Sequence, residues 1–296
     1  MSMVKWDQMA EKFFEGGCSK GMCYTGYDTT SKTYTVGEAW NGVSGFTDNP
    51  SGADEQASYA DNIKYISMRG AENYGGTIKC FWYPNNFRAC LGKKTAVDGV
   101  TVSQQAREVF GFAVTTQVGS DTMGTEAGET IHLVWNATSS PSSKDYSSLN
   151  ESPSPSELSF EFACNPVAVG DGSKFKPTAN MEITTVGKNP TDHADFFAKY
   201  EALKRILYGA DYVAGADDSY FYESVPSTTT TAPENWATDV TAGKYYTKSS
   251  NTYTVVASGT SFSSGTTYYS LKNASLPSPD AIITLFGGTV NTVPEG

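Results

Sequence analysis

Hydrophobic residues in this chain of 296 residues fall mostly into short runs that are rich in β-branched and aromatic side chains. Such runs, bounded by polar or glycine-containing stretches, predict β-strands. Gly75 and Gly76 stand just before one of them and favour a tight turn there. The strands expected on this basis cover residues 62–68, 77–83, 107–118, 130–136, 157–165 and 180–186.

One segment differs, because its apolar residues recur every three or four positions, which predicts an amphipathic helix. We expect this helix over residues 191–208, with Thr191 or Asp192 as its N-cap and Gly209 just after its end. A single amphipathic helix among strands is expected to lie on a sheet face. Its apolar stripe consists of Phe196, Phe197, Tyr200, Leu203, Ile206 and Leu207.

The composition changes after this helix. Between Ser227 and Ser270, 20 of the 44 residues are Ser or Thr and only four are charged, which marks a boundary. Strand-like runs at 243–248, 253–257 and 265–272 make a small β-meander the expected fold of this part. The domains predicted are a β domain of residues 1–210, completed by 274–296, and a Ser/Thr-rich β insert of residues 211–273.

The charge balance narrows the classes of function. The chain has 32 acidic and 21 basic residues, a net charge of −11 at pH 7. A general nucleic-acid binder needs a basic face for phosphate contacts, so that class is disfavoured. A protein that lets DNA pass without holding it remains compatible with this charge.

The sequence also indicates the cellular compartment in which the protein is made. No apolar run approaches the roughly 18 residues that a membrane span needs. The N-terminal segment carries charges and Trp6 where a signal peptide needs an unbroken apolar stretch, so synthesis in a cytosol is expected. Five cysteines are an odd number in a chain of this size, which favours reduced and mostly buried thiols.

A search for catalytic or metal-binding motifs finds little. No phosphate-binding loop, dinucleotide fingerprint, zinc-protease helix or nucleophile elbow occurs in the sequence. His132 lies within an expected strand, His193 lies at the expected helix start, and no local spacing supports a catalytic pair. Cys18 and Cys23 lack the second ligand pair that a zinc site needs. We therefore expect no enzymatic activity, no metal and no cofactor.

An acidic segment and an aromatic segment each leave two interpretations open. Residues 119–129 are expected to form a mobile loop at the tip of a long hairpin, with no Lys or Arg between Arg107 and Lys144. This tip is either an ordinary solvated loop, or an acidic surface that faces a polyanion or orders against a partner. The aromatic residues Trp82, Tyr83 and Phe87 are either a ligand-stacking patch or part of a core or interface.

A series of segments along the chain carries a more specific indication. Within residues 39–87 the most telling are NPSGA, YADNIKY, AENYGGTI and YPNNF. Further segments are QQAREVFGF (104–112), HLVWNATSSPSSKDYSSLNESP (132–153), FKPTANMEI (175–183), the helix end ALKRILYG and LPSPDAIITLF (276–286). In this order they resemble the major tail protein of long, non-contractile (siphovirus-type) bacteriophage tails. The resemblance covers most of residues 1–210 and the last twenty or so, and the insert departs from it.

The resemblance implies a mainly β fold, a tail-tube β-sandwich or barrel with one flanking helix. It also implies that six copies close a ring with sheets joined across subunits, and that rings stack into a tube around a tape-measure protein. DNA then passes through the lumen without specific binding. The other implied partners are the tail terminator and the distal tail or baseplate proteins. The implied location is the virion tail, assembled in the host bacterial cytoplasm.

Three surfaces follow as expectations from this resemblance. The segment 48–62 should contact the neighbouring subunit or ring, the tip at 121–129 should order on assembly, and the insert should project outward as a decoration. The assembly or lumen candidates are Asp54, Glu55, Asp61, Asp121, Glu126 and Glu129.

Two rival interpretations remain. One is a carbohydrate-binding β-sandwich of a tail tip or cell surface, favoured by the Tyr and Trp content and the Ser/Thr-rich insert. It predicts a monomer or small oligomer that binds glycans, and it gives the helix and the acidic loop no role. The other is a glycosidase with two carboxylates, which lacks a recognisable site.

Overall fold

The computed structural model describes residues 6, 9, 12–52, 54–144, 148, 155–209, 222–225, 231–250 and 252–291. The fold is mainly β with antiparallel sheets, as the sequence predicts. The chain divides into two compact units, the first formed by Met1–Tyr200 with Leu276–Gly296 and the second by Glu201–Ser275. The second unit begins within the helix rather than at residue 211.

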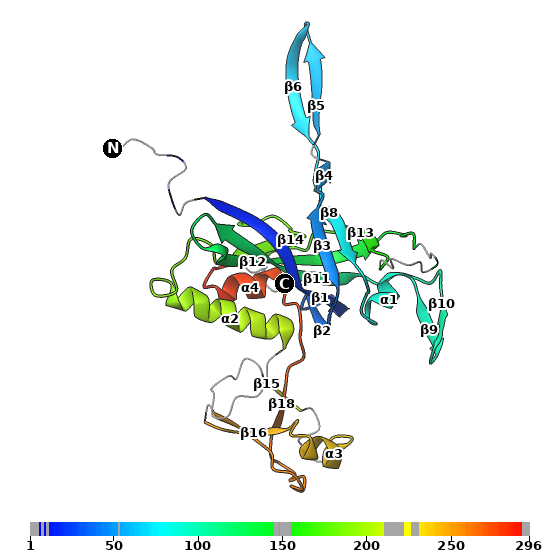
Figure 1. The fold of residues 1–296 in the computed structure, drawn as a ribbon, viewed down its shortest axis with the longest axis vertical. Coiled ribbons are helices and arrows are strands. Elements are labelled where there is room, and N and C mark those ends of the chain that lie inside the picture. Colours follow the sequence, from blue (N-terminus) through cyan, green and yellow to red (C-terminus); the bar gives the residue numbers. More distant parts are fainter. Residues whose placement is uncertain are drawn as a thin grey trace. The chain divides into compact units, whose positions relative to one another are not determined.

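The first unit is built on one large sheet of eight strands (Figure 1). Along its main path the neighbours pair in the order β2-β1-β11-β12-β13-β8-β3, and β14 also pairs with β12. The strands are β1 (Phe13–Asp28), β2 (Thr33–Ala39), β3 (Val43–Asp48), β8 (Gly75–Cys80), β11 (Phe110–Ser120), β12 (Gly124–Ser139), β13 (Leu158–Cys164) and β14 (Asn180–Thr184).

Burial along the strands follows from their hydrophobic patterns. β11 begins with an apolar run, lies between β1 and β12, and is buried along almost its whole length. β13 alternates strictly between buried and exposed residues, so it covers the core with one face. The far strand β3 returns towards β1, since a Cβ built on Gly21 would lie 2.7 Å from Val43 Cγ2. The sheet therefore curls around its apolar face.

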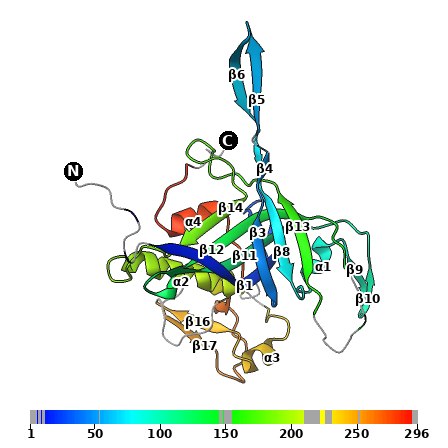
Figure 2. The same ribbon diagram turned by 45° about the horizontal axis from the view of Figure 1, so that its top comes forward.

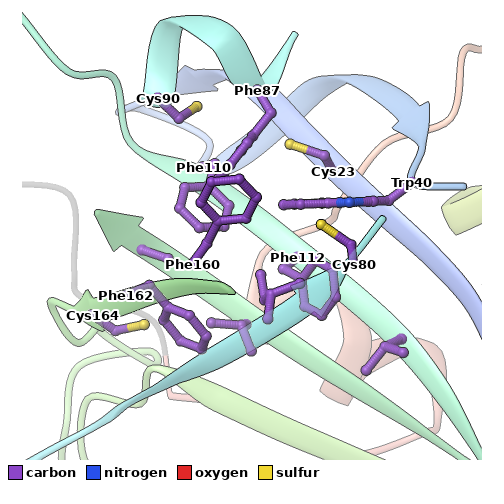
Figure 3. Close-up of a cluster of buried hydrophobic side chains, with 14 of the residues drawn as sticks. Cys23, Trp40, Cys80, Phe87, Cys90, Phe110, Phe112, Phe160, Phe162 and Cys164 are labelled. Atoms are coloured by element: carbon purple, nitrogen blue, oxygen red, sulfur yellow. The ribbon is translucent and has the colours of Figure 1, made fainter. Parts of the chain in front are cut away.

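That face encloses an aromatic core (Figure 3). Trp40 is 2% exposed, and its ring centroid lies 4.5 Å from that of Phe87 and 5.6 Å from that of Phe112. The indole Nε1 of Trp40 donates a hydrogen bond of 2.8 Å to the Trp82 carbonyl oxygen. Cys23, Cys80, Cys90 and Cys164 are buried in the same cluster, and all five cysteines are free thiols, as expected.

Three helices belong wholly or partly to this unit: α1 (Phe87–Cys90), α2 (Ala194–Tyr208) and α4 (Pro279–Leu285). The helix predicted over residues 191–208 is α2, and Phe196 packs on Phe286 with ring centroids 5.3 Å apart. The chain then re-enters the unit beside β2, where Leu276 and Tyr34 exchange two backbone hydrogen bonds of 2.9 and 3.0 Å. None of the helices in the described ranges is long and apolar enough to cross a membrane.

Two thin hairpins extend from the large sheet (Figures 1 and 2). One contains β4 (Ser51–Gly52) paired with β7 (Glu72–Asn73), followed by β5 (Glu55–Ala60) paired with β6 (Ile63–Arg69). The other pairs β9 (Lys94–Val97) with β10 (Val100–Val102).

The second unit is a four-stranded sheet in the order β15-β18-β16-β17, with one short helix. Its elements are β15 (Tyr222–Ser224), α3 (Trp236–Thr241), β16 (Tyr246–Ser249), β17 (Thr252–Val255) and β18 (Tyr268–Leu271). Tyr222, Tyr246 and Tyr253 form one cluster, against which Ala202 and Ile206 of α2 pack. Val240, Tyr245, Val256 and Tyr268 form a second cluster. Aromatic residues in the described part of the insert thus form clusters within it.

Two expectations about turns are wrong. Gly75 and Gly76 do not form a turn but lie in β8, where Phe162 and Thr47 approach too closely to admit a side chain at Gly76. The acidic segment 119–129 is not an eleven-residue loop, because β12 begins at Gly124 and pairs with β11 down to Ser120.

Candidate functional site

The hairpin that contains β4 to β7 is a continuous two-stranded ribbon, which we call the arm (residues 49–74). Pairing advances without a shift from Gly45 opposite Lys79, through Ser51 opposite Asn73, to Ser58 opposite Ile66. The β3–β8 pair of the large sheet therefore continues directly into the arm. Of the segment 48–62, expected to contact a neighbour, residues 49–62 belong to one side of this ribbon, and Asp48 is the last residue of β3.

The end of the arm is a two-residue turn at Asp61 and Asn62. Both residues have positive φ, +52° and +63°, which a type I′ hairpin turn requires. Asp and Asn adopt this left-handed conformation more readily than other non-glycine residues, so the YADNIKY segment encodes the turn. A register shift between Ser58 and Tyr59 adds a bulge just before it.

The arm is exposed on both faces. Every residue of β5 and β6 is exposed, and several are large and apolar. Tyr59 is 71% exposed, Ile63 67% and Tyr65 76%; Met68 and Ile66 are also exposed. An isolated two-stranded ribbon is marginally stable in water, and its outer edges present unpaired backbone groups. The arm therefore has the properties of a segment that another chain covers.

The six acidic candidates fall into two groups on separate elements. Asp54 directly precedes β5, Glu55 opens that strand, and Asp61 lies in the turn, so these three belong to the arm. Glu55 accepts hydrogen bonds from Lys64 and Ser67 across the ribbon, and these hold the pKa of its carboxyl below the ordinary value. Both partners are exposed, so this pair fixes local geometry more than it stabilises the fold.

The second group lies at the β11–β12 hairpin. Asp121 is in the turn, and Glu126 and Glu129 are part of β12. The sequence around them has no nearby base, but β1 supplies one: Lys20 Nζ lies 3.6 Å from Glu129 Oε2. The backbone of Glu129 is also fixed by Thr185, whose amide donates to its carbonyl oxygen at 3.0 Å. This tip is part of the folded sheet.

The aromatic patch divides between core and surface. Phe87 is fully buried, whereas Trp82 is 58% exposed and stacks on Tyr83 with centroids 5.5 Å apart. Beside Tyr83 is a cavity of about 240 Å³, whose lining includes Lys93 and Arg107. The cavity is smaller than the usual ligand site of roughly 300–1,000 Å³.

The structure also brings together a polar cluster that local sequence spacing could not indicate. The cluster consists of His132 of β12, Glu182 of β14 and Asp48 of β3. One imidazole nitrogen and one oxygen of each carboxylate, atoms that can bind a metal ion, lie within 4.8 Å of one another. Glu15 of β1 lies on the other side of the imidazole, 3.1 Å from its Nε2. The only indication in the sequence is a histidine inside a strand pattern.

No protein-family model matches this chain, and no curated protein matches it. Among the solved structures similar to this chain, two match it over 62% of its length. The tube-terminating cap of the anti-feeding prophage is 11% identical, is covered over 97% of its length, and has a TM-score of 0.27. A chain of the sheath–tube complex of an extracellular contractile injection system, in the extended state, is 14% identical, is covered over 94%, and has a TM-score of 0.22. At these scores the superpositions carry no functional conclusion.

Proposed function

We propose that this protein is a structural subunit of a phage tail tube, of the long non-contractile kind. Copies close into rings, six to a ring, and the rings stack into a tube around a tape-measure protein. The tube later conducts DNA during ejection, and it meets the tail terminator and the distal tail proteins at its ends. The protein acts in the virion tail after assembly in the host cytoplasm, and it is not an enzyme.

The observation that carries the proposal is the arm. It continues the β3–β8 pair out of the sheet and exposes apolar side chains on both of its faces. Because the side chains of a strand alternate, Tyr65 and Ile66 point to opposite faces. A partner that covers only one face would leave the apolar side chains of the other face exposed to water. Neighbouring copies on both sides, as in a stack of rings, cover both.

The open edges of the large sheet support the same function. β2 and β3 end the main path of the sheet, where β2 is bridged by Leu276 at Tyr34, and in the described part of the chain β14 pairs only with β12. Strand edges of this kind are templates for pairing with another chain, and a closed ring removes them. The net charge of −11 agrees with a conduit that phosphates pass without sticking.

A carbohydrate-binding module is the second candidate, and Trp82 is the observation that favours it. An exposed indole stacked on Tyr83, beside a cavity whose lining includes Lys93 and Arg107, is a surface on which a sugar ring could stack. The insert gives this candidate little support, because Tyr and Trp residues of its described part form internal clusters.

The test is negative-stain electron microscopy of the purified chain together with light-scattering mass over a concentration series. We expect rings or tubes with a central hole from the wild-type chain. The triple variant Tyr59→Thr, Tyr65→Thr, Ile66→Thr should lose them while its thermal unfolding stays unchanged, because these side chains are exposed.

The matched control changes Val97, Val100 and Val102 to Thr on the β9–β10 hairpin, which is also exposed and apolar. This variant should assemble like the wild type. Assembly that survives in the arm variant would contradict the role of the arm. A wild-type monomer that binds glycans, and loses them on Trp82→Ala, would replace the tube with the second candidate.

A further inference from the structure

The concave face of the large sheet changes from apolar to polar along its length. Cross-strand pairs on this face run from Phe112 opposite Val134, to Val114 opposite His132, to Thr116 opposite Thr130. Phe112, Val114 and Val134 belong to the core, whereas His132 follows at its edge. The imidazole packs near Phe46, with ring centroids 6.1 Å apart, and the His132 side chain is only 12% exposed.

The two nitrogens of His132 have different surroundings. Nε2 lies 2.9 Å from Thr116 Oγ1 and 3.1 Å from Glu15 Oε1. Nδ1 is buried and has no hydrogen-bond partner, although Glu182 Oε1 is 3.5 Å away. A carboxylate that accepts from Nε2–H leaves the lone pair on Nδ1. This nitrogen then faces carboxylate oxygens, which are also acceptors.

We propose that Asp48, His132 Nδ1 and Glu182 bind a divalent transition-metal ion, with Zn²⁺ as the best fit. A cation between Nδ1 and the carboxylate oxygens removes the repulsion between these acceptors, because each of the three groups can donate a lone pair to it. Two ligands of a tetrahedral zinc ion with bonds of 2.0–2.1 Å lie about 3.4 Å apart. The 3.5 Å between Nδ1 and Glu182 Oε1 is close to this spacing. The three candidate ligand atoms lie within 4.8 Å of one another, so the set contracts when the ion binds.

The remaining groups suit the same assignment. Tyr74 donates its hydroxyl hydrogen to Asp48 Oδ1 and so helps to hold this carboxylate in place. Glu15 takes the place of the outer carboxylate that orients a metal-bound histidine. In the described ranges none of Glu15, Asp48 and Glu182 forms an ion pair with a lysine or arginine. The cluster thus has negative charge for a cation to neutralise.

The donor set selects the class of ion. Magnesium and calcium prefer ligand sets made of oxygen atoms, whereas one imidazole with two carboxylates suits Zn²⁺ or Mn²⁺. Three protein ligands leave a fourth position for water. Asp48 is the last residue of β3 before the arm, so the bound ion joins the base of the arm to β12 and β14. This role is structural and holds whatever covers the arm.

The test is isothermal titration of the metal-stripped full chain with Zn²⁺ and, separately, with Mn²⁺, Mg²⁺ and Ca²⁺. We expect one saturable Zn²⁺ site and a higher unfolding temperature with the ion. The double variant Asp48→Asn, Glu182→Gln removes two charged ligands with almost no change of shape. It should bind at least about tenfold more weakly and lose the rise in unfolding temperature.

Glu126→Gln is the matched control, because it removes an exposed carboxylate of the same sheet, and it should bind like the wild type. Co²⁺ absorption spectra distinguish this site from thiol ligation, since the proposed site contains no sulfur. Absence of a saturable heat, unchanged affinity in the double variant, or a thiolate-to-Co²⁺ band would each overturn the proposal.

Discussion

Burial controls the chemistry of the cysteines in the first unit. Cys90 is fully buried, and desolvation of the thiolate raises its pKa from 9.0 to about 12. The same cause raises the pKa of Cys80 to about 11. The folded state therefore holds these protons more tightly than the unfolded state does. The stability linked to each thiol is complete below the unfolded pKa and is lost as pH rises towards the folded pKa.

We accordingly expect the free energy of unfolding to fall as pH rises above about 9, and Cys90→Ala to make the fall shallower. A thiol protonated only in the folded state contributes a slope of up to about 1.4 kcal/mol per pH unit. Urea denaturation at a series of pH values between about 9 and 10.5 measures this slope. Cys18→Ala is the control, because Cys18 is only partly buried and should affect the slope less. An unchanged slope in Cys90→Ala would show that its thiol is not the source.

Two glycines in neighbouring strands at the base of the arm differ in the space around them. Comparing them distinguishes a glycine that close packing requires from one that only weakens the strand. A Cβ on Gly76 would meet the Thr47 carbonyl oxygen directly and would lie 2.8 Å from Phe162 Cζ. A Cβ on Gly45 would have Lys79 Cβ as its nearest neighbour, at 3.7 Å. Only the first position requires glycine for close approach.

Gly76→Ala should destabilise the protein by about 1–3 kcal/mol, because the strands must move apart or strain. Gly45→Ala should leave stability unchanged or raise it by up to about 1 kcal/mol, since alanine reduces the freedom of the unfolded chain. Urea denaturation of both variants beside the wild type measures the difference. Equal effects at the two sites would mean that β3 and β8 are less tightly packed than the contacts imply.

Sequence patterns predicted the elements in which apolar and polar positions recur with a regular period. The alternation of residues 157–165 gave β13, and the helical spacing gave α2. β1 escaped prediction because four glycines interrupt FFEGGCSKGMCYTGYD, although Cys23 and Tyr24 within it are fully buried. Gly75 and Gly76 were misinterpreted because a local pattern cannot reveal that a partner strand requires the absence of a side chain.

The candidate sites were predictable only in part. All of the expected contact segment 48–62 except Asp48 lies on the arm, but exposure of both faces depends on where the β3–β8 pair leaves the sheet. The cluster around His132 was not predictable, because strand register creates it. β12 and β14 place His132 opposite Glu182, and the curl of the sheet adds Asp48.

At the scale of the molecule, the insert is attached in a way that permits its removal. Its two ends meet, since a Cβ on Gly209 would lie 3.9 Å from the Ala274 backbone nitrogen, and Ser275 donates its amide to the Ile206 carbonyl oxygen at 3.0 Å. The insert also has its own clusters of buried residues. A module with adjacent ends and its own core adds few constraints to its host.

Replacement of residues 210–273 by two glycines should therefore leave the first unit folded and the proposed assembly intact. Ile206 packs on the tyrosine cluster of the insert, so Ile206→Lys in the same variant prevents a new apolar surface. Circular dichroism tests the fold, and electron microscopy with light-scattering mass tests the assembly. The arm triple variant is the comparison, because it is expected to fold without assembling. If the insert is an outward decoration, the shortened chain assembles and the arm variant does not. A shortened chain that folds but stays monomeric would instead make the insert part of the contact between copies.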